Sequence, residues 1–435
     1  MAKYFNNVFW RWHFYAALFI APLLITLSIS GILYLFFPEV EHVINDHELF
    51  GQTGKPQQSL DDGFSDIAMK YPGWHVMKVS FPEKDYNTRV TLMGPDDGSK
   101  IVYLDHHNQI QAAINPNQLF SNVTRAFHSS LLTGNTVVNY MVELAACWTL
   151  FLVISGLFMT FYKKYLTQSK SPIKRKNKAK LHAVIGTVIA IPLTLIILSG
   201  LPWSGYMGDK IYGFAVSHTK LGYPEAEKIA PVSGNEIPWA TRNEHTDSTA
   251  AHGKRLSITQ IISIAEEEGF KQPYSITVPM DDQGTYILSV NSSTGVTGLD
   301  TSPLDERTVH LDQYSGMKLA IYDFTDYGII AKLISVAIPL HEGHLFGLAN
   351  KLLNLIVAAA VLVTAYYGIK IYLMRKVPRQ LSAPATQPFQ VPFLIFACLM
   401  ILLGVAMPLF GWSLLVIAAI EISRLIVHRS KNQQI

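Results

Sequence analysis

The sequence is poor in charged residues and in cysteine, and both shortages limit what it can be. Asp, Glu, Lys and Arg make up 15% of the 435 residues, whereas apolar residues make up 49%. Soluble proteins have roughly 25% charged residues, so a simple water-soluble globule is excluded. Disorder is excluded too, because it requires low hydrophobicity and high net charge. A formal charge of only +3 argues against a nucleic-acid partner.

Several motifs that commonly hold cofactors or nucleotides are also missing. The two cysteines, Cys147 and Cys398, each lie in an apolar run and cannot form the disulfide framework of a small secreted domain. The sequence has no CxxCH for covalent haem attachment, no HExxH, no GxGxxG and no P-loop. A bound cofactor would therefore have to be held by other residues.

Long apolar runs, by contrast, are frequent. A membrane-spanning helix needs about 20 mostly apolar residues, and four runs meet this length: 14–37, 137–162, 181–201 and 352–374. The first is too long for a signal-peptide core and has no small-residue cleavage site, so we interpret it as a retained anchor. Two shorter runs, 391–407 and 412–427, flank a Pro-Leu-Phe-Gly turn signal and are interpreted as a hairpin of two helices.

The distribution of Lys and Arg predicts the orientation of these runs. Basic residues are concentrated in the segment 163–180, after the second run, and again directly after the fourth run. The positive-inside rule places both segments in the cytoplasm, and the two termini agree with this placement. The long segments 38–136 and 202–350 are then expected outside the cytoplasm.

Both outer segments have the same order of predicted elements. Each begins with a helical period, at 60–70 and at 257–268. Alternating patterns typical of strands follow, at 74–81, 88–93 and 100–105 in the first segment and at 274–279, 285–291 and 307–312 in the second. We therefore expect each segment to be a small domain with one helix and an antiparallel sheet.

The membrane segments repeat as well. His13 precedes Gly31 by 18 residues, and His182 precedes Gly200 by the same 18. Each of these glycines follows a serine, and His128 lies six residues before a glycine, as His341 does. These spacings predict an internal duplication, in which two runs and their outer domain form one copy.

The predicted fold is a membrane α-helical bundle of four core helices and a C-terminal two-helix hairpin, with two extracytoplasmic α+β domains. The expected boundaries are 1–37, 137–162, 181–201 and 351–375 for the four helices; 38–136 and 202–350 for the outer domains; 163–180 and 376–390 for cytoplasmic segments; 391–427 for the hairpin; and 428–435 for a cytoplasmic tail.

Four histidines are placed so that each membrane face receives two. His13 and His182 open the first and third runs on the cytoplasmic side, and His128 and His341 precede the second and fourth runs on the outer side. Imidazole is a good ligand for iron, and cofactors are built between facing helices of bundles. A haem with two axial histidines has no open coordination position. It therefore transfers electrons and does not bind oxygen. The sequence thus predicts two bis-histidine haem groups, with His344 as the alternative to His341.

Four glycines and one arginine are predicted to border these groups. Eighteen residues make five helical turns, so His13 and Gly31 share a face about 27 Å apart. Gly31 and Gly200 would then leave room for the opposite haem, and Gly156 and Gly368 would do so in the other two helices. Arg125, three residues before His128, could neutralise a haem propionate; a lipid headgroup contact is the alternative. Glu143, inside the second run, is a functional candidate unless it is merely interfacial.

Short motifs make the chain resemble a known family. They are Trp12-His13, Phe127-His128, Leu181-His182 and Leu340-His341-Glu342-Gly343, with Tyr103-Leu104-Asp105 and Leu311-Asp312-Gln313-Tyr314-Ser315-Gly316 as strand ends. Over residues 5–375 the sequence resembles the PepSY-associated transmembrane proteins, which include inner-membrane ferric-siderophore reductases of Gram-negative bacteria.

The resemblance implies a di-haem b reductase of the bacterial inner membrane with PepSY-like periplasmic domains. Electrons would pass from the cytoplasmic side to a ferric siderophore or other ferric chelate, releasing Fe(II). His13 and His182 would ligate the inner haem, and His128 and His341 the outer one. The electron donor, a quinol or a separate flavoprotein, has no visible binding motif in the chain, and the remaining expected partner is membrane lipid.

Two other functions are open from the sequence. The outer domains could form a haem-free binding or regulatory module, with the helices as a scaffold. Alternatively, the parallel repeats could belong to a transporter of iron chelates. A reduced-minus-oxidised visible spectrum separates the first alternative from the reductase, and chelate uptake without reduction would favour the second.

Overall fold

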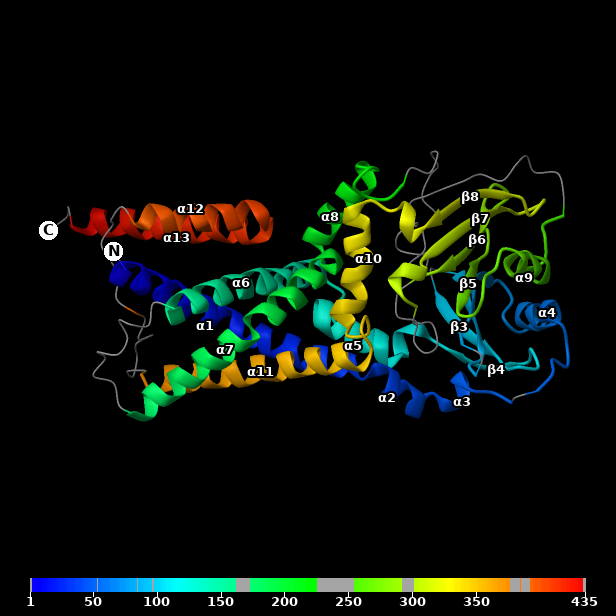
Figure 1. Cartoon of the computed structure of the whole chain (residues 1–435), viewed down its shortest axis with the longest axis horizontal. Coiled ribbons are helices and arrows are strands. Elements are labelled where there is room, and N and C mark those ends of the chain that lie inside the picture. The colour runs from blue at the N-terminus through cyan, green and yellow to red at the C-terminus, as the bar shows by residue number, and fades with distance from the viewer. Residues whose placement is uncertain are drawn as a thin grey trace. The chain divides into compact units, whose positions relative to one another are not determined.

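The structure is a computed structural model that describes residues 2–52, 54–83, 85–95, 98–161, 173–224, 254–291, 301–375, 384 and 392–432. The chain forms two compact units (Figure 1). The helical unit comprises residues 1–32, 126–210 and 351–435, and the sheet unit comprises residues 33–125 and 211–350.

Four long apolar helices make up most of the helical unit. They are α1 (Ala2–Leu35), α6 (Thr136–Phe161), α7 (Ile173–Gly200) and α11 (Leu348–Leu373). Among the described residues these are the four helices long and apolar enough to cross a membrane. All four predicted spans are therefore helical, and in Figure 1 they run lengthwise beside one another.

The C-terminal hairpin packs on this bundle. It consists of α12 (Pro392–Ala406) and α13 (Pro408–Asn432), whose described apolar stretches are shorter than those of the four long helices. Phe396 and Phe410 are fully buried in an apolar cluster with residues of α1 and α6. The indole of Trp148 donates a hydrogen bond to the Ser413 hydroxyl (3.1 Å), so the hairpin is an integral part of the unit.

Two predicted cytoplasmic segments differ from the structure. The expected basic segment 163–180 is helical from Ile173 onward, because its Lys, Arg and Ala residues are good helix formers that extend α7. The expected tail 428–435 is likewise helical as far as Asn432. Residues 162–172 and most of 376–390 lie outside the described residues.

The described part of the sheet unit contains one eight-stranded antiparallel sheet, in the order β4-β3-β2-β1-β5-β6-β7-β8. The strands of the first half are β1 (His75–Phe81), β2 (Thr88–Met93), β3 (Ser99–Leu104) and β4 (Ile110–Ile114). Those of the second half are β5 (Tyr274–Thr277), β6 (Thr285–Val290), β7 (Arg307–Asp312) and β8 (Lys318–Asp323).

The two expected domains thus share a single sheet. Strand β1 pairs with β5, with Val79 opposite Ile276, and both side chains are fully buried. In two separate domains, β1 and β5 would each be an apolar edge strand with unpaired backbone groups, which favours aggregation. The pairing of β1 with β5 removes both of these exposed edges. The outermost strands, β4 and β8, were not predicted, because their short apolar runs alternate weakly.

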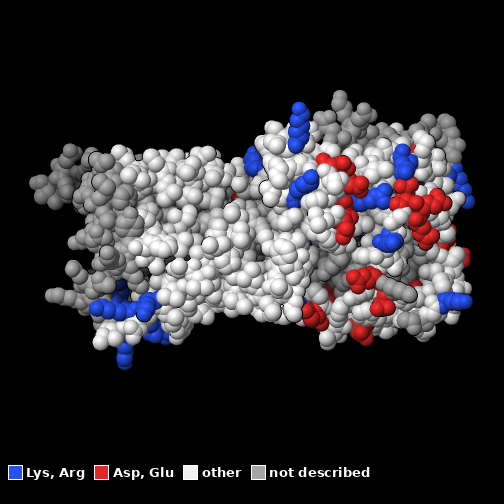
Figure 2. Space-filling model, in the orientation of Figure 1, with Lys and Arg blue, Asp and Glu red and all other residues white. Residues whose placement is uncertain are grey.

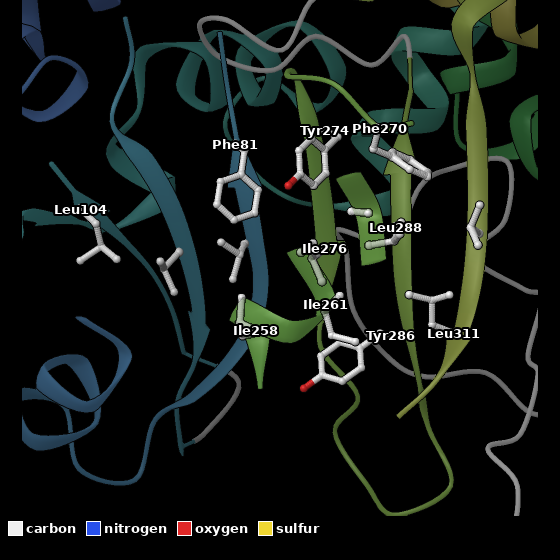
Figure 3. Packing of buried hydrophobic residues seen from close by; sticks show 14 of the residues in the cluster. Phe81, Leu104, Ile258, Ile261, Phe270, Tyr274, Ile276, Tyr286, Leu288 and Leu311 are labelled. Atoms are coloured by element: carbon white, nitrogen blue, oxygen red, sulfur yellow. The ribbon is translucent and has the colours of Figure 1, made fainter. Parts of the chain in front are cut away.

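One face of the sheet carries the apolar core. Helices α4 (Leu60–Lys70) and α9 (Ile258–Glu267) both begin with a capping box, formed by Ser59 with Asp62 and by Ser257 with Gln260. Their apolar side chains join those of the strands in one cluster. Figure 3 shows Ile258 and Ile261 of α9 among residues of several strands, including Phe81, Leu288 and Leu311.

The strand-end motifs have a structural explanation. Asp105 accepts hydrogen bonds from the backbone N–H groups of His107 and Gln109 (both 2.9 Å). Asp312 does the same for Tyr314 and Ser315 (2.9 and 2.8 Å). Each aspartate therefore holds the turn that leads into the outermost strand of its half, as is usual for Asp in turns.

Shorter helices connect these parts of the chain. They are α2 (Phe37–Ile44), α3 (Asp46–Leu49), α5 (Phe120–Ser130), α8 (Tyr206–Ser217) and α10 (Ile329–Glu342). Two of them, α5 and α10, carry His128 and His341.

Candidate functional site

The structure brings His13 and His182 together inside the helical unit. His13 lies on α1 and His182 on α7, and their ring centroids are 6.3 Å apart with the ring planes at 89°. Two metal–imidazole bonds of about 2 Å each, plus the distance from each bonding nitrogen to its ring centre, add up to about 6 Å. Ligands on a common axis can rotate about it, so perpendicular rings are compatible with one metal ion between them.

A serine orients the ring of His13. Nδ1 of His13 lies 2.8 Å from the hydroxyl oxygen of Ser155 on α6. That hydroxyl donates its own proton to the carbonyl of Phe151 (2.7 Å), so we assign the proton of the imidazole to Nδ1. Nε2 of His13 then keeps its lone pair for a metal, which is the usual arrangement of ligating histidines.

A backbone carbonyl does the same for His182. Nδ1 of His182 lies 2.9 Å from the carbonyl oxygen of Thr364 on α11, which can only accept a hydrogen bond. The proton of this imidazole is therefore on Nδ1 and its Nε2 is a lone-pair donor. Both rings of the pair are thus in the tautomer that metal ligation requires.

His128 repeats this arrangement at the other end of α1. Its Nδ1 lies 2.9 Å from the hydroxyl of Ser30, which in turn bonds to the carbonyl of Leu27 (3.1 Å). Ser199, the serine of the repeated Ser-Gly pair on α7, makes the equivalent bond to the carbonyl of Ile196 (2.9 Å). Sequence reasoning missed Ser30 as an orienting group, although the repeated Ser-Gly pairs were the signal that could have found it.

The outer histidines precede sharp turns. Helix α5 ends two residues after His128, and Leu131, Leu132 and Gly134 all have positive φ before α6 begins. Gly343 and Gly347 have φ of 87° and 57° between α10 and α11. The glycine six residues after each histidine therefore serves a left-handed turn, which glycine adopts without strain. This break also explains why these histidines and the glycines of the following helices are not separated by whole helical turns.

The second predicted pair is divided between the two units. His128 belongs to the helical unit and His341 to the sheet unit, so their pairing stays a prediction. Nε2 of the alternative residue, His344, lies 3.3 Å from the carboxylate of Glu342. That contact engages Nε2, one of the two ring nitrogens through which His344 could bind a metal.

Three of the four predicted glycines lie beside a histidine ring. A β-carbon placed on Gly31 would lie 3.5 Å from Cε1 of His128, one on Gly156 would lie 3.5 Å from Cε1 of His13, and one on Gly368 would lie 3.5 Å from Cε1 of His182. Apart from the glycine's own helix backbone, no described atom outside these histidine rings comes within 4 Å of the three positions. Gly200 is the last residue of α7, and its role stays a prediction.

Comparison with known proteins identifies the family. The family model described as PepSY-associated TM region matches residues 10–375. The chain belongs to this family. It is a multi-pass membrane protein, consistent with its four long apolar helices. No curated protein matches the chain, and the α12–α13 hairpin lies outside the matched region.

Arg125 of this PepSY-associated protein is surrounded by groups that balance its charge. It is largely buried, and burial alone would lower the pKa of its guanidinium. The neighbouring Tyr34 and Glu342, with a further contribution from Glu41, outweigh burial and raise that pKa. The predicted contact of Arg125 with a haem propionate stays a prediction, but its charge already faces two carboxyl side chains.

Glu143 has a structural role inside α6. Its side chain is buried, and its carboxylate accepts backbone N–H bonds from Tyr206 (2.8 Å) and Met207 (3.1 Å). These two residues begin α8, so the carboxylate caps a helix N-terminus, where negative charge is favoured. This partner explains why an acidic residue is tolerated in an apolar helix.

The residues of the inner pair fit a haem. Among the described residues there is no group of three or more His, Cys, Asp or Glu side chains that could hold a metal ion. A bis-histidine haem takes only two protein ligands, because the porphyrin supplies the others. The ring spacing, the protonated Nδ1 atoms and the absence of a side chain at Gly156 and Gly368, beside the two rings, all suit such a group.

Proposed function

We propose that this protein is a transmembrane oxidoreductase of the bacterial inner membrane with two bis-histidine haem b groups. It passes electrons from the cytoplasmic side to a ferric chelate in the periplasm, with a ferric siderophore as the expected substrate. The observation that carries the proposal is the His13–His182 pair, whose ring spacing of 6.3 Å suits two axial ligands of one iron.

Neighbouring groups prepare this pair for ligation. The Ser155 hydroxyl and the Thr364 carbonyl hold the two Nδ1–H groups, which keeps each Nε2 lone pair directed away from these partners. Gly156 and Gly368 leave space next to the same two rings. Bound haem supplies one-electron oxidation and reduction, and two axial histidines leave it no position for oxygen.

His128 supports a second group at the opposite end of the bundle. Its Nδ1 is held by Ser30, next to Gly31, and Gly31 is 18 residues from His13 along α1. At 1.5 Å per residue this separation is about 27 Å, close to the roughly 30 Å thickness of the hydrocarbon core. We assign His341 as the partner of His128, because Glu342 engages His344.

The expected reaction is the one-electron reduction of chelated Fe(III) to Fe(II). Hard oxygen ligands bind Fe(III) more strongly than Fe(II), so reduction weakens the chelate and releases the metal. Each iron ion takes one electron, which the protein receives at its cytoplasmic side from a quinol or a reduced flavoprotein. The chain then needs no nucleotide site of its own.

Purified full-length protein, expressed with ample haem, tests the cofactor assignment. We expect two haem groups per chain and a b-type reduced-minus-oxidised spectrum. His13→Ala and His182→Ala should each remove one haem and leave the other, and His128→Ala and His341→Ala should remove the second. A colourless wild-type protein would overturn the proposal. Loss of the outer haem in His344→Ala, with retention in His341→Ala, would overturn the ligand assignment.

The substrate is tested separately. Reduced protein should be reoxidised by a ferric siderophore while a ferrous-specific chelator accumulates its coloured complex in equal amount. If the haem groups are present but stay reduced in the presence of ferric chelates, the electron-transfer proposal survives and the ferric acceptor is wrong.

A further inference from the structure

Arg375 lies in an unusual position at the end of α11. It occupies the turn that follows Leu373, and its guanidinium carbon lies 5.0 Å from the ring centre of Trp10 and 4.9 Å from that of Phe14, both on α1. Cation–π contacts of this kind hold a guanidinium in place and leave its N–H groups free to donate elsewhere. Among the described residues, none accepts a hydrogen bond from the buried Nε of Arg375.

The charge of Arg375 lacks a carboxylate partner among the described side chains. Burial lowers the pKa of Arg375, the positive charge of Arg175 lowers it further, and only the hydroxyl of Tyr372 acts in the opposite direction. The helical unit has just three acidic residues, Glu143, Asp209 and Glu421. Glu143 caps α8 and Asp209 lies in α8, near the opposite end of the bundle.

Both arginines lie close to the inner histidine pair along their helices. Arg175 precedes His182 by seven residues on α7, which is two turns, so the two residues share a helix face. Arg375 follows Gly368, the glycine beside His182, by the same seven residues. Phe14, which contacts Arg375, is next to His13 in the sequence.

We propose that Arg375, assisted by Arg175, binds an oxyanion at the cytoplasmic side of the His13–His182 pair. A carboxylate or a phosphate oxygen would accept a hydrogen bond from the unpaired Nε–H of Arg375 and reduce the repulsion between the two arginines. Charge-assisted hydrogen bonds of this type are roughly twice as strong as neutral ones. If the proposed function holds, the oxyanion is a propionate of the inner haem; a lipid phosphate has the same chemistry and is the other source.

Arg11 provides a matched control. Its guanidinium also lies over an aromatic ring, that of Tyr15 at 5.1 Å, but it donates a hydrogen bond to the carbonyl of Pro384. Arg11→Gln therefore removes an equal charge from the same helical unit without removing an unpaired donor. Arg375→Lys keeps the positive charge of Arg375 but loses the planar set of N–H donors of the guanidinium.

The experiment uses full-length protein either in phosphate-free dodecyl maltoside micelles, with residual lipid removed, or in nanodiscs that contain anionic phospholipid. His128→Ala serves as the background, because only the inner haem should then remain. We expect Arg375→Gln to lower haem retention and to shift the midpoint potential of the inner haem to more negative values, since a positive charge near the iron favours the reduced state. Arg375→Lys should restore part of the potential, and Arg11→Gln should have little effect.

The lipid arms identify the source of the oxyanion. A shift of equal size in micelles and in nanodiscs supports a propionate, and a shift that requires phospholipid supports a lipid phosphate. If the protein proves to be haem-free, native mass spectrometry still tests the site. Arg375→Gln should then lose bound anionic lipid that wild type and Arg11→Gln retain. Identical behaviour of Arg375→Gln and Arg11→Gln in every assay would overturn the oxyanion site.

Discussion

The two units of this protein carry opposite charges. The helical unit has 19 Lys and Arg against three Asp and Glu, which gives +16, whereas the sheet unit has 16 against 29, which gives −13. In the view of Figure 2, Lys and Arg gather at one end of the helical unit, and acidic residues are spread over the sheet unit. A total charge of +3 thus conceals two electrostatically different regions.

The units also differ in how their interiors are filled. The sheet unit has a continuous apolar core of its own, built from both halves of the sheet and two helices. The helical unit combines a tight aromatic cluster around Phe151 and Phe396 with two glycines, Gly156 and Gly368, that lie directly beside the rings of His13 and His182. The sheet unit is therefore stabilised by its own packing, while the helical unit has its smallest residues beside the inner histidine pair.

The largest expected effect concerns these glycines. Gly156→Leu should abolish most binding of the inner haem, because the β-carbon would already lie 3.5 Å from Cε1 of His13 and the rest of the leucine side chain would crowd that ring. The control is Gly186→Leu on α7, since among the described residues no atom outside the nearby backbone of α7 itself lies within 4 Å of a β-carbon there. Haem content per chain is the measurement, and equal loss in both variants would mean that glycine-to-leucine changes merely disturb the helices.

The apolar core of the sheet should respond to truncation without affecting the haem spectrum. Leu288 is fully buried in the cluster of Figure 3, so Leu288→Ala should destabilise the sheet unit by about 2–5 kcal/mol. Hydrogen exchange of strand amides in the full-length protein measures the loss. A concurrent loss of the inner haem would show that the two units are not separately stabilised.

The opposite charges predict opposite salt effects at the two faces. In right-side-out vesicles, where the proposed orientation exposes the acidic sheet unit, a cationic acceptor such as hexaammineruthenium(III) should oxidise the reduced protein more slowly as salt rises. An anionic acceptor such as ferricyanide should react faster, because salt screens its repulsion. The rate should change roughly tenfold between low and high salt. Inverted vesicles should reverse both signs, and salt slopes of the same sign in the two orientations would refute the comparison.

The smallest expected effect comes from Glu41 in the sheet unit. Burial raises the pKa of this carboxyl, although the Ser121 N–H bond and nearby arginines partly oppose the shift. A raised folded-state pKa means that the stability contribution is present below the ordinary carboxyl pKa and is lost as pH rises through the raised value. Glu41→Gln, which cannot ionise, should therefore gain stability relative to wild type as pH increases. Urea unfolding of both proteins across this pH range measures the difference, and a constant difference would contradict the assignment.

Much of the local structure could be predicted from the sequence. The helix at 60–70 and the strand at 88–93 match α4 and β2 residue for residue, because capping signals and alternation operate over a few neighbouring positions. The four spans were predictable for the same reason, since a bilayer selects length and apolarity. The edge strands β4 and β8 escaped prediction because partly exposed edge strands need little alternation.

The candidate site was predicted only in part. The repeated spacing of His13 and His182 marked both residues, since the same residue type recurred at the same helical depth. The hydrogen bonds of Ser155 and the Thr364 carbonyl could not be predicted, because they join helices more than 140 residues apart in the chain. Arg125 was proposed from its place three residues before His128, and sequence proximity could not show that Glu342 and Glu41 already face its charge.

The sequence by itself determined where the apolar helices and strands lie, where the histidines fall along them, and how charge is divided along the chain. These properties depend on residue type and short-range spacing, and the periodic pattern of apolar and polar residues can be read directly from the sequence. Only the tertiary structure decided that both outer halves share one sheet, that two imidazoles face each other at 6.3 Å, and that a buried guanidinium nitrogen has no acceptor among the described residues. Those outcomes arise from packing between segments that are distant in the sequence. Many residues have suitable chemistry to pair with one another, and only the folded geometry decides which of them meet.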